Sequence, residues 1–183
     1  MAATFLKAQN YEIGRSLFEA DRLDTTIKLL RKANESGVQL LLPTDVLVAD
    51  SINAPSGQIV PVENILADKM IVDIGPQTIR RFTEVLQKSK TVFWNGPMGI
   101  YEYTQFAGGT RTLAELLAGL PARTIIGGGS TADIIADLKL SDKMTFVSTG
   151  GGFDELCQRR KATRRRGAAG QERLIREACQ RGI

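Results

Sequence analysis

The chain has 183 residues, of which 43% are apolar and 24% charged, values typical of a soluble globular protein with one substantial core. It has no histidine, two cysteines (Cys157 and Cys179), no long apolar run and no secretory pattern at its N-terminus. These features exclude imidazole chemistry, a disulfide framework and a membrane helix, and they predict a cytoplasmic location. The net charge of +4 comes from residues 153–183, which hold nine Lys or Arg and four Asp or Glu.

The first third of the chain predicts helices followed by buried strands. Apolar residues at helical spacing predict two helices over 5–36, broken near Asp21. Two apolar runs, 38–42 and 46–49, predict buried strands on either side of a proline. The turn-rich stretch 51–62 predicts a surface excursion, for which a small hairpin is one candidate form.

From residue 70 onward, short apolar runs alternate with helical patterns. We expect strands at 70–74, 91–94, 124–126 and 145–147, and helices at 77–88, 106–117 and 131–138. This alternation predicts parallel βαβ units with right-handed crossovers. The predicted fold class is α/β, with a parallel Rossmann-like sheet and helices on both faces in three layers, α/β/α.

Three of the predicted strands run into glycine-bearing turns, at Trp94–Gly99, Gly127–Thr131 and Ser148–Gly152. A glycine turn between a strand and a helix lets backbone N–H groups approach a phosphate, and the helix N-terminus adds partial positive charge. Three such turns predict a nucleotide site at the carboxyl edge of a parallel sheet. Asp73, which precedes Gly75-Pro76, is predicted to be a cap or turn residue.

In this order, the motifs resemble phosphoglycerate kinase, specifically its C-terminal nucleotide-binding domain. The resemblance covers residues 1–152 and depends most on Trp-Asn-Gly-Pro-Met-Gly at 94–99 and Ser-Thr-Gly-Gly-Gly at 148–152. It also includes 41–50, 73–78 and 124–131. Members of this family transfer a phosphoryl group between 1,3-bisphosphoglycerate and ADP, using Mg²⁺, in a two-domain hinge enzyme.

The resemblance implies a role for each site residue, and each has a purely structural alternative. Glu102 would bind the ribose, or be a solvated carboxylate. Asn95 and Pro97 would shape the nucleotide pocket, although Asn95 is also a turn former. Gly128, Gly129, Ser130 and Thr131 would form the phosphate loop, and Gly129 with Gly150, Gly151 and Gly152 would face the transferring phosphoryl group. The implied ligands are ATP or ADP and Mg²⁺.

The chain departs from the family in ways that bear on activity. It begins inside the family's C-terminal domain, so 3-phosphoglycerate is expected to bind only if the N-terminal domain is supplied. Ser130 stands where many relatives have a metal-binding Asp, which makes it the candidate Mg²⁺ ligand, and Ile71 stands where a glycine lines the adenine slot. The chain alone is predicted to be a monomer without kinase activity. The alternative is a noncatalytic adenine-nucleotide binder.

The basic tail, residues 153–183, does not continue the family pattern. A permitted coding string for Lys161–Ala169, shifted by one base, encodes Lys-Leu-Pro-Gly-Val-Glu-Ala-Leu, which is similar to the family at this point. The hypothesis is therefore an out-of-frame or disordered tail. A basic nucleic-acid-binding arm is the rival reading, and the absence of aromatic residues after Phe153 argues against it.

Overall fold

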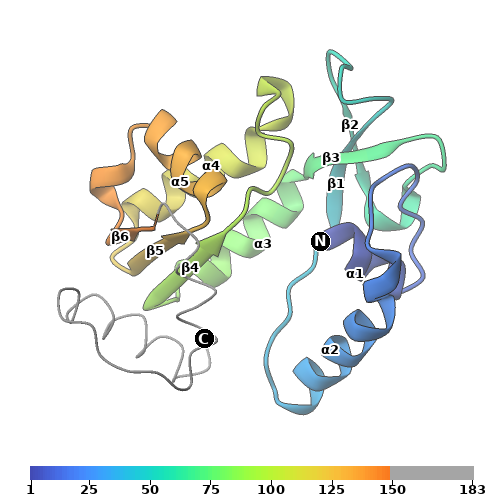
Figure 1. Cartoon of the computed structure of the whole chain (residues 1–183), viewed down its shortest axis with the longest axis horizontal. Helices are drawn as coiled ribbons and strands as arrows, with labels where there is room; N and C mark the ends of the chain where they lie inside the picture. The colour runs from blue at the N-terminus through green and yellow to red at the C-terminus, as the bar shows by residue number, and fades with distance from the viewer. Residues whose placement is uncertain (149–183) are drawn as a thin grey trace. The chain divides into compact units, whose positions relative to one another are not determined.

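The computed structural model describes residues 1–148 and divides them into two compact units (Figure 1). Unit 1 consists of Met1–Val85 and Met98–Leu113, and unit 2 consists of Leu86–Pro97 and the described residues from Ala114 onward. Helices α3 (Pro76–Leu86) and α4 (Gly108–Gly119) each contribute residues to both units.

Unit 1 contains a three-stranded sheet with the order β2-β1-β3. Strands β1 (Asp45–Ala49), β2 (Gln58–Pro61) and β3 (Met70–Ile74) are all antiparallel to their neighbours. The candidate hairpin at 51–62 is confirmed, because β1 and β2 pair as antiparallel strands on either side of this turn. The prediction of parallel strands is wrong for this sheet. Only a 3-10 turn, Val62–Asn64, lies between β2 and β3, and a parallel connection needs a longer crossover.

The helices of the first third are shorter than predicted. Helix α1 spans Ala2–Ala8, a 3-10 turn spans Ala20–Arg22, and α2 spans Leu23–Glu35. Two helices are present, but residues 9–19 between them are irregular rather than helical. Gly14 has a left-handed φ of 56° and pairs with Met70 as an isolated bridge, and a Cβ at Gly14 would lie 2.0 Å from the carbonyl oxygen of Lys69. This long-range contact overrides the local helical pattern.

The strand predicted at 38–42 is also wrong. The residues join neither sheet of the described chain, and Val38 and Leu40 are 54% and 42% exposed. Apolar character alone does not make a strand, because a strand also needs a partner for its backbone hydrogen bonds. The segment leads through Pro43 into β1.

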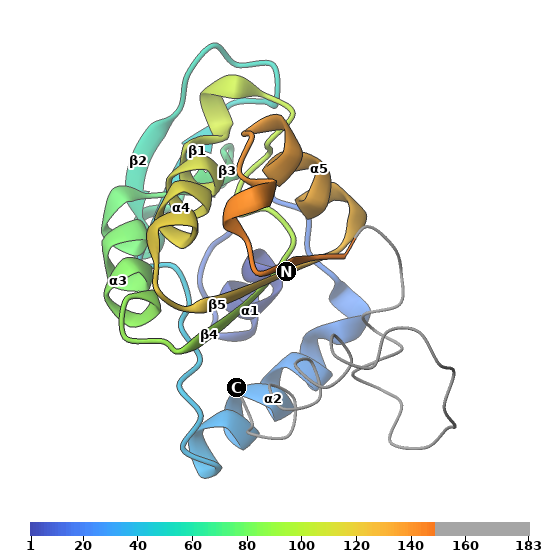
Figure 2. The same ribbon diagram turned by 90° about the vertical axis from the view of Figure 1, so that its left-hand side faces the viewer.

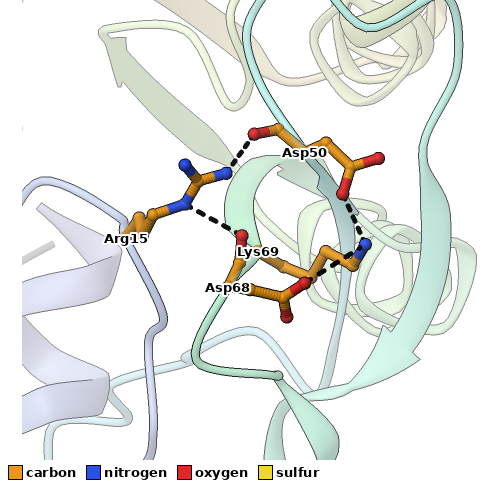
Figure 3. Close-up of polar contacts among 4 residues, drawn as sticks. All are labelled: Arg15, Asp50, Asp68 and Lys69. Atoms are coloured by element: carbon orange, nitrogen blue, oxygen red, sulfur yellow. Dashed lines mark hydrogen bonds and ion pairs between the residues drawn. The ribbon is translucent and has the colours of Figure 1, made fainter.

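A polar network fastens the irregular segment 9–19 to the chain before β3 (Figure 3). The Arg15 guanidinium donates to the carbonyl oxygen of Asp68 at 2.8 Å and to that of Asp50. The Lys69 ammonium lies 2.5 Å from a carboxylate oxygen of Asp50 and 3.7 Å from one of Asp68. The Lys69 ammonium lowers the pKa of the Asp50 carboxyl through a hydrogen bond and its charge. Asp50, through the same hydrogen bond, raises the pKa of Lys69.

The apolar core of unit 1 gathers residues from α1, the irregular segment and the sheet. One cluster joins six buried residues: Leu6, Ile13, Val46, Val48, Val62 and Ile65. A second cluster joins Ala49, Val72 and Phe106. Phe106 ends the 3-10 turn Thr104–Phe106 and is fully buried, so it anchors the residues before α4 to β3.

Unit 2 has the predicted parallel sheet, which Figure 2 shows from a second side. Its strands are β4 (Thr91–Asn95), β5 (Arg123–Gly127) and β6 (Phe146–Val147), in the order β4-β5-β6. Helix α5 (Gly129–Asp137) follows β5, and a 3-10 turn, Ser141–Lys143, precedes β6. The α/β class is confirmed, and α3, α4 and α5 lie within two residues of their predicted bounds at each end.

No helix among residues 1–148 combines the length and the apolar character needed to cross a membrane.

Candidate functional site

The carboxyl ends of β4 and β5 place two of the predicted glycine turns side by side in unit 2. The strands are parallel, and Asn95 pairs in register with Gly127. The chain leaves β4 through Gly96, whose φ is 91°, and leaves β5 through Gly128, whose φ is 88°. Parallel strands end at one edge of their sheet, and this edge is where α/β folds bind ligands.

The N-terminus of α5 opens directly from this edge. Gly128 is its N-cap, and no side chain caps the helix. The first N–H groups of an α-helix have no partner within the helix, and here they belong to Gly129 and Ser130, which are exposed. They point partial positive charge outward at the end of the helix. This geometry suits an anion such as a phosphate.

Asn95 lies beside the helix start, and Pro97 follows it by two residues in the chain. Both residues are exposed. The side-chain Oδ1 of Asn95 lies 2.6 Å from the position that a Cβ on Gly128 would occupy, so no larger residue fits at 128 without displacing it. The Asn95 amide and the start of α5 therefore belong to one surface of unit 2.

The Thr131 side chain has a structural role, and its predicted place in the phosphate loop stays a prediction. Its side chain is fully buried, and its hydroxyl accepts a hydrogen bond of 2.7 Å from the backbone N–H of Gly96. The indole N–H of Trp94 donates to the Gly96 carbonyl oxygen at 2.6 Å. The peptide groups of Gly96 are thus held on both sides, and Thr131 ties the first turn to the second.

The third turn is only partly described. The N–H of Ser148 donates to the carbonyl oxygen of Ile126 at 2.9 Å, which places the end of β6 beside β5. Gly150, Gly151 and Gly152 lie outside the described residues, as does the tail 153–183, so the roles predicted for them stay predictions.

Two predicted site residues belong to unit 1. Glu102 is exposed, on the loop between β4 and α4. Ile71 is half-buried in β3, its side chain packs against the core cluster around Leu6 and Val46, and its N–H donates to the Ser16 hydroxyl at 2.8 Å. At least part of the Ile71 side chain therefore serves the core.

Two buried carboxylates in unit 1 cap helices. Asp45 in β1 is 1% exposed and accepts from the N–H groups of Gln77 and Thr78 at 3.0 and 2.7 Å, at the start of α3. Asp73 in β3 is 3% exposed and accepts from Gly109 in α4 at 2.7 Å. The prediction that Asp73 is a cap is confirmed, with a partner 36 residues away. Burial raises the pKa of Asp73, and hydrogen bonds from Gly109, Ile74 and Gly108 oppose this.

These caps set the start of α5 apart. The N-termini of α3 and α4 each receive a carboxylate from within the protein, whereas that of α5 is left with exposed donors and no capping side chain. Sequence reasoning did not predict Thr131 or Asp45 in these structural roles. The only signal was their residue types, since Thr and Asp side chains accept readily from backbone N–H groups.

The donor set fits phosphate better than a free metal ion. Residues 1–148 contain no group of three or more His, Cys, Asp or Glu side chains able to hold a metal. Ser130 offers one exposed neutral hydroxyl beside the anion-binding donors. A hard cation such as Mg²⁺ usually takes few protein ligands and several from phosphate and water, so these residues fit a metal that arrives with a nucleotide.

The parallel strands, the glycine turns at their carboxyl ends and the uncapped helix define the class of α/β phosphate-binding domains. Residues 1–153 match the family model described as Phosphoglycerate kinase. The chain belongs to the phosphoglycerate kinase family.

Individual relatives agree with the family match. Over about 155 residues, or 83% of the chain, it is 51% identical to phosphoglycerate kinase of Pelotomaculum thermopropionicum and 48% identical to that of Thermosynechococcus vestitus. A solved structure of phosphoglycerate kinase from Coxiella burnetii covers 84% of the chain with a TM-score of 0.82 and 39% identity. The chain spans 39% of the length of these curated relatives and 41% of the Coxiella burnetii chain.

Proposed function

We propose that this chain supplies the nucleotide-binding part of a phosphoglycerate kinase, which transfers a phosphoryl group between 1,3-bisphosphoglycerate and ADP. The observation that carries the proposal is the uncapped N-terminus of α5 at the carboxyl edge of β4 and β5. The family match over residues 1–153 supports it independently. The partner of this site is an adenine nucleotide, with ATP or ADP as the ligand and Mg²⁺ as the accompanying ion.

In this proposal the exposed donors of α5 bind the nucleotide phosphates. The N–H groups of Gly129 and Ser130 lie where they can donate to phosphate oxygens without losing an existing cap. The Ser130 hydroxyl is the one side-chain group of the loop that reaches solvent and could join the coordination of Mg²⁺. When bound, Mg²⁺ neutralises charge on the phosphate oxygens.

The remaining residues bind the rest of the nucleotide. Asn95 and Pro97 form the wall next to the phosphate donors, Glu102 accepts from the ribose hydroxyls, and Ile71 limits the space for adenine. Gly150, Gly151 and Gly152 add backbone donors toward the phosphoryl group that is transferred. Phosphoryl transfer depends on such positioning and on charge stabilisation, which is consistent with a chain that has no histidine.

The chain alone is proposed to bind nucleotide without turning over substrate. The chain spans 39% of the length of its relatives. In the family that it resembles, the N-terminal domain binds the phosphoglycerate, and hinge closure needs both domains. The protein is proposed to act in the cytoplasm and to be monomeric. A noncatalytic adenine-nucleotide binder is the second candidate.

Titration calorimetry with ADP and a coupled kinase assay test the proposal. ADP with Mg²⁺ should bind with one-to-one stoichiometry, whereas adenosine, which has no phosphates, should bind much more weakly. The chain alone should show no turnover. Co-expression with the N-terminal domain of a relative should restore turnover, and its failure to do so would leave the noncatalytic binder. Absence of ADP binding would contradict both candidates.

A further inference from the structure

The loop that carries Glu102 is held near both ends by buried groups of unit 1. We call residues 98–107 the Glu102 loop. At its start, the N–H of Met98 donates to the Thr110 hydroxyl at 3.0 Å, and the N–H of Ile100 donates to the carbonyl oxygen of Val72 at 2.9 Å. At its end, Phe106 is fully buried and α4 begins at Gly108.

Asp73 contacts the start of this loop and the first turn of α4, which follows it. Its Oδ1 accepts from the N–H of Ile74 at 2.8 Å, and its Oδ2 accepts from the N–H of Gly109 at 2.7 Å. A Cβ on Gly99 would lie 2.5 Å from the Asp73 carboxylate carbon, so the backbone at Gly99 packs directly against the carboxylate. One buried side chain on β3 therefore meets the residues that lead into the Glu102 loop and the residues that follow it.

We propose that Asp73 is a positioning residue for nucleotide recognition, because it fixes the ends of the Glu102 loop and so holds Glu102 where it can accept from the ribose. The inference rests on the proposed function of Glu102. Asp73 itself, 3% exposed and with both oxygens engaged, does not touch the nucleotide. Hydrogen bonds to a carboxylate are stronger than neutral ones, so this contact restrains the loop more than a neutral acceptor would.

Restraint of the loop matters because a free loop must be ordered when ligand binds. Ordering residues costs conformational entropy, and a loop already held in its bound form avoids this cost. Loss of the Asp73 contact should therefore weaken the part of nucleotide affinity that comes from Glu102. It should leave the contribution of the phosphate donors in unit 2 unchanged.

Asp45 provides a matched control. It is also a buried carboxylate on a strand of unit 1 that accepts from backbone N–H groups at a helix start. Its carboxylate hydrogen bonds run to Gln77 and Thr78 of α3 rather than to the residues around the Glu102 loop. Asp45→Asn should cost stability, as Asp73→Asn does, without affecting ribose recognition.

The test compares the full chain with its variants Glu102→Gln, Asp73→Asn and Asp45→Asn. Calorimetry measures affinity for ADP and for 2′,3′-dideoxy-ADP, which lacks the ribose hydroxyls. Hydrogen exchange measures protection of the backbone amides. The unaltered chain and Asp45→Asn should bind ADP more tightly than 2′,3′-dideoxy-ADP by the same factor. In Glu102→Gln and Asp73→Asn this factor should be about tenfold smaller. In Asp73→Asn, the amides of Ile100 and Gly109 should exchange faster.

The outcomes separate the inference from the proposed function. If Asp73→Asn keeps the preference of the unaltered chain, or keeps slow exchange at Ile100 and Gly109, the inference is overturned. If the unaltered chain binds ADP and 2′,3′-dideoxy-ADP equally well, the ribose role of Glu102 is wrong. The inference that Asp73 positions Glu102 for the ribose is then wrong as well. Should Asp73→Asn not fold, Thr110→Val removes the acceptor of Met98 and tests the same loop, with Thr110→Ser as the rescue.

Discussion

The hydroxyl of Thr131 accepts a hydrogen bond of 2.7 Å from the backbone N–H of Gly96. This bond joins two turns that leave neighbouring parallel strands, and it is fully buried on the Thr131 side. It explains how the turn after β4 keeps Asn95 beside the start of α5. Of the residues that the sequence predicts as a phosphate loop, Thr131 thus supports the turn from inside, whereas Gly129 and Ser130 are exposed.

Thr131→Val should lower the stability and the ADP affinity of the chain. Valine has a similar shape but no acceptor, so the N–H of Gly96 loses its partner, at a cost of about 1–3 kcal/mol. Thr131→Ser keeps the hydroxyl and should restore most of both properties. Urea unfolding and calorimetry measure them. Equal ADP affinity in the Val variant and the unaltered chain would contradict a role for this bond in the site.

Gly128→Ala should destabilise unit 2. Gly128 has a φ of 88°, and a Cβ there would lie 2.6 Å from the Asn95 side-chain oxygen. A non-glycine residue in such a conformation costs about 1–3 kcal/mol before the steric clash is added. Adding Asn95→Ala should remove the clash but not the backbone strain, and should recover part of the loss. Urea unfolding of the single and double variants measures both contributions.

Gly119→Ala is the control for this substitution. Gly119 ends α4, and within residues 1–148 no atom other than its chain neighbours and the backbone of its own helix lies within 4 Å of its Cβ position. Alanine there should be neutral or should stabilise by about 0.4–1 kcal/mol, because it restricts the unfolded chain. If Gly119→Ala lowers the free energy of unfolding as much as Gly128→Ala does, the effect at Gly128 does not come from its backbone conformation or its contact with Asn95.

The pH dependence of stability should show the buried state of Asp73. Its pKa is raised above the ordinary value of 3.8, mainly by burial, so the folded chain binds this proton more tightly than the unfolded chain. Stability from this group is therefore greatest below pH 3.8 and falls as pH rises through the raised pKa. Denaturant unfolding gives the free energy of unfolding of the unaltered chain and of Asp73→Asn. The difference between these two free energies should shrink as pH rises over this window. A difference that grows would mean a lowered pKa.

The Asp50 carboxyl should titrate at a higher pH once Lys69 is removed. The hydrogen bond and charge of the Lys69 ammonium hold the pKa of Asp50 below 3.8. Stability from this pair is therefore present above pH 3.8 and is lost as pH falls through the lowered pKa. NMR titration of the Asp50 carboxyl carbon should show an upward shift in Lys69→Met. Asp68→Asn should have a smaller effect on this titration, because the Asp68 carboxylate lies 3.7 Å from the Lys69 ammonium and acts on Asp50 only through it.

The parallel half of the fold could be predicted because its signals are local. Strands β4 and β5 each run into a glycine turn, and the helix after β5 follows within two residues, so the order of residues alone indicates the crossover. Unit 1 depends on distant contacts instead. Gly14 against Lys69 breaks the expected helix, and β3 pairs antiparallel with β1, and neither contact leaves a periodic pattern in the sequence.

The same distinction applies to the candidate site. The proximity of Asn95 and Gly128 follows from the parallel pairing of β4 and β5, and it was predictable once these strands were assigned. The buried position of Thr131 was not, because a threonine in the first turn of a helix can face a ligand or the neighbouring turn. Only the bond to Gly96 decides between these two orientations.

Amide NMR of the full chain, titrated with ADP and Mg²⁺ and separately with adenosine, tests whether the start of α5 binds the nucleotide phosphates. ADP should cause its largest saturable shifts at the amides of Gly128, Gly129 and Ser130, and adenosine, without phosphates, should leave these three unchanged. Saturable ADP binding that shifts other amides while these three stay in place would rule out the start of α5 as the phosphate site.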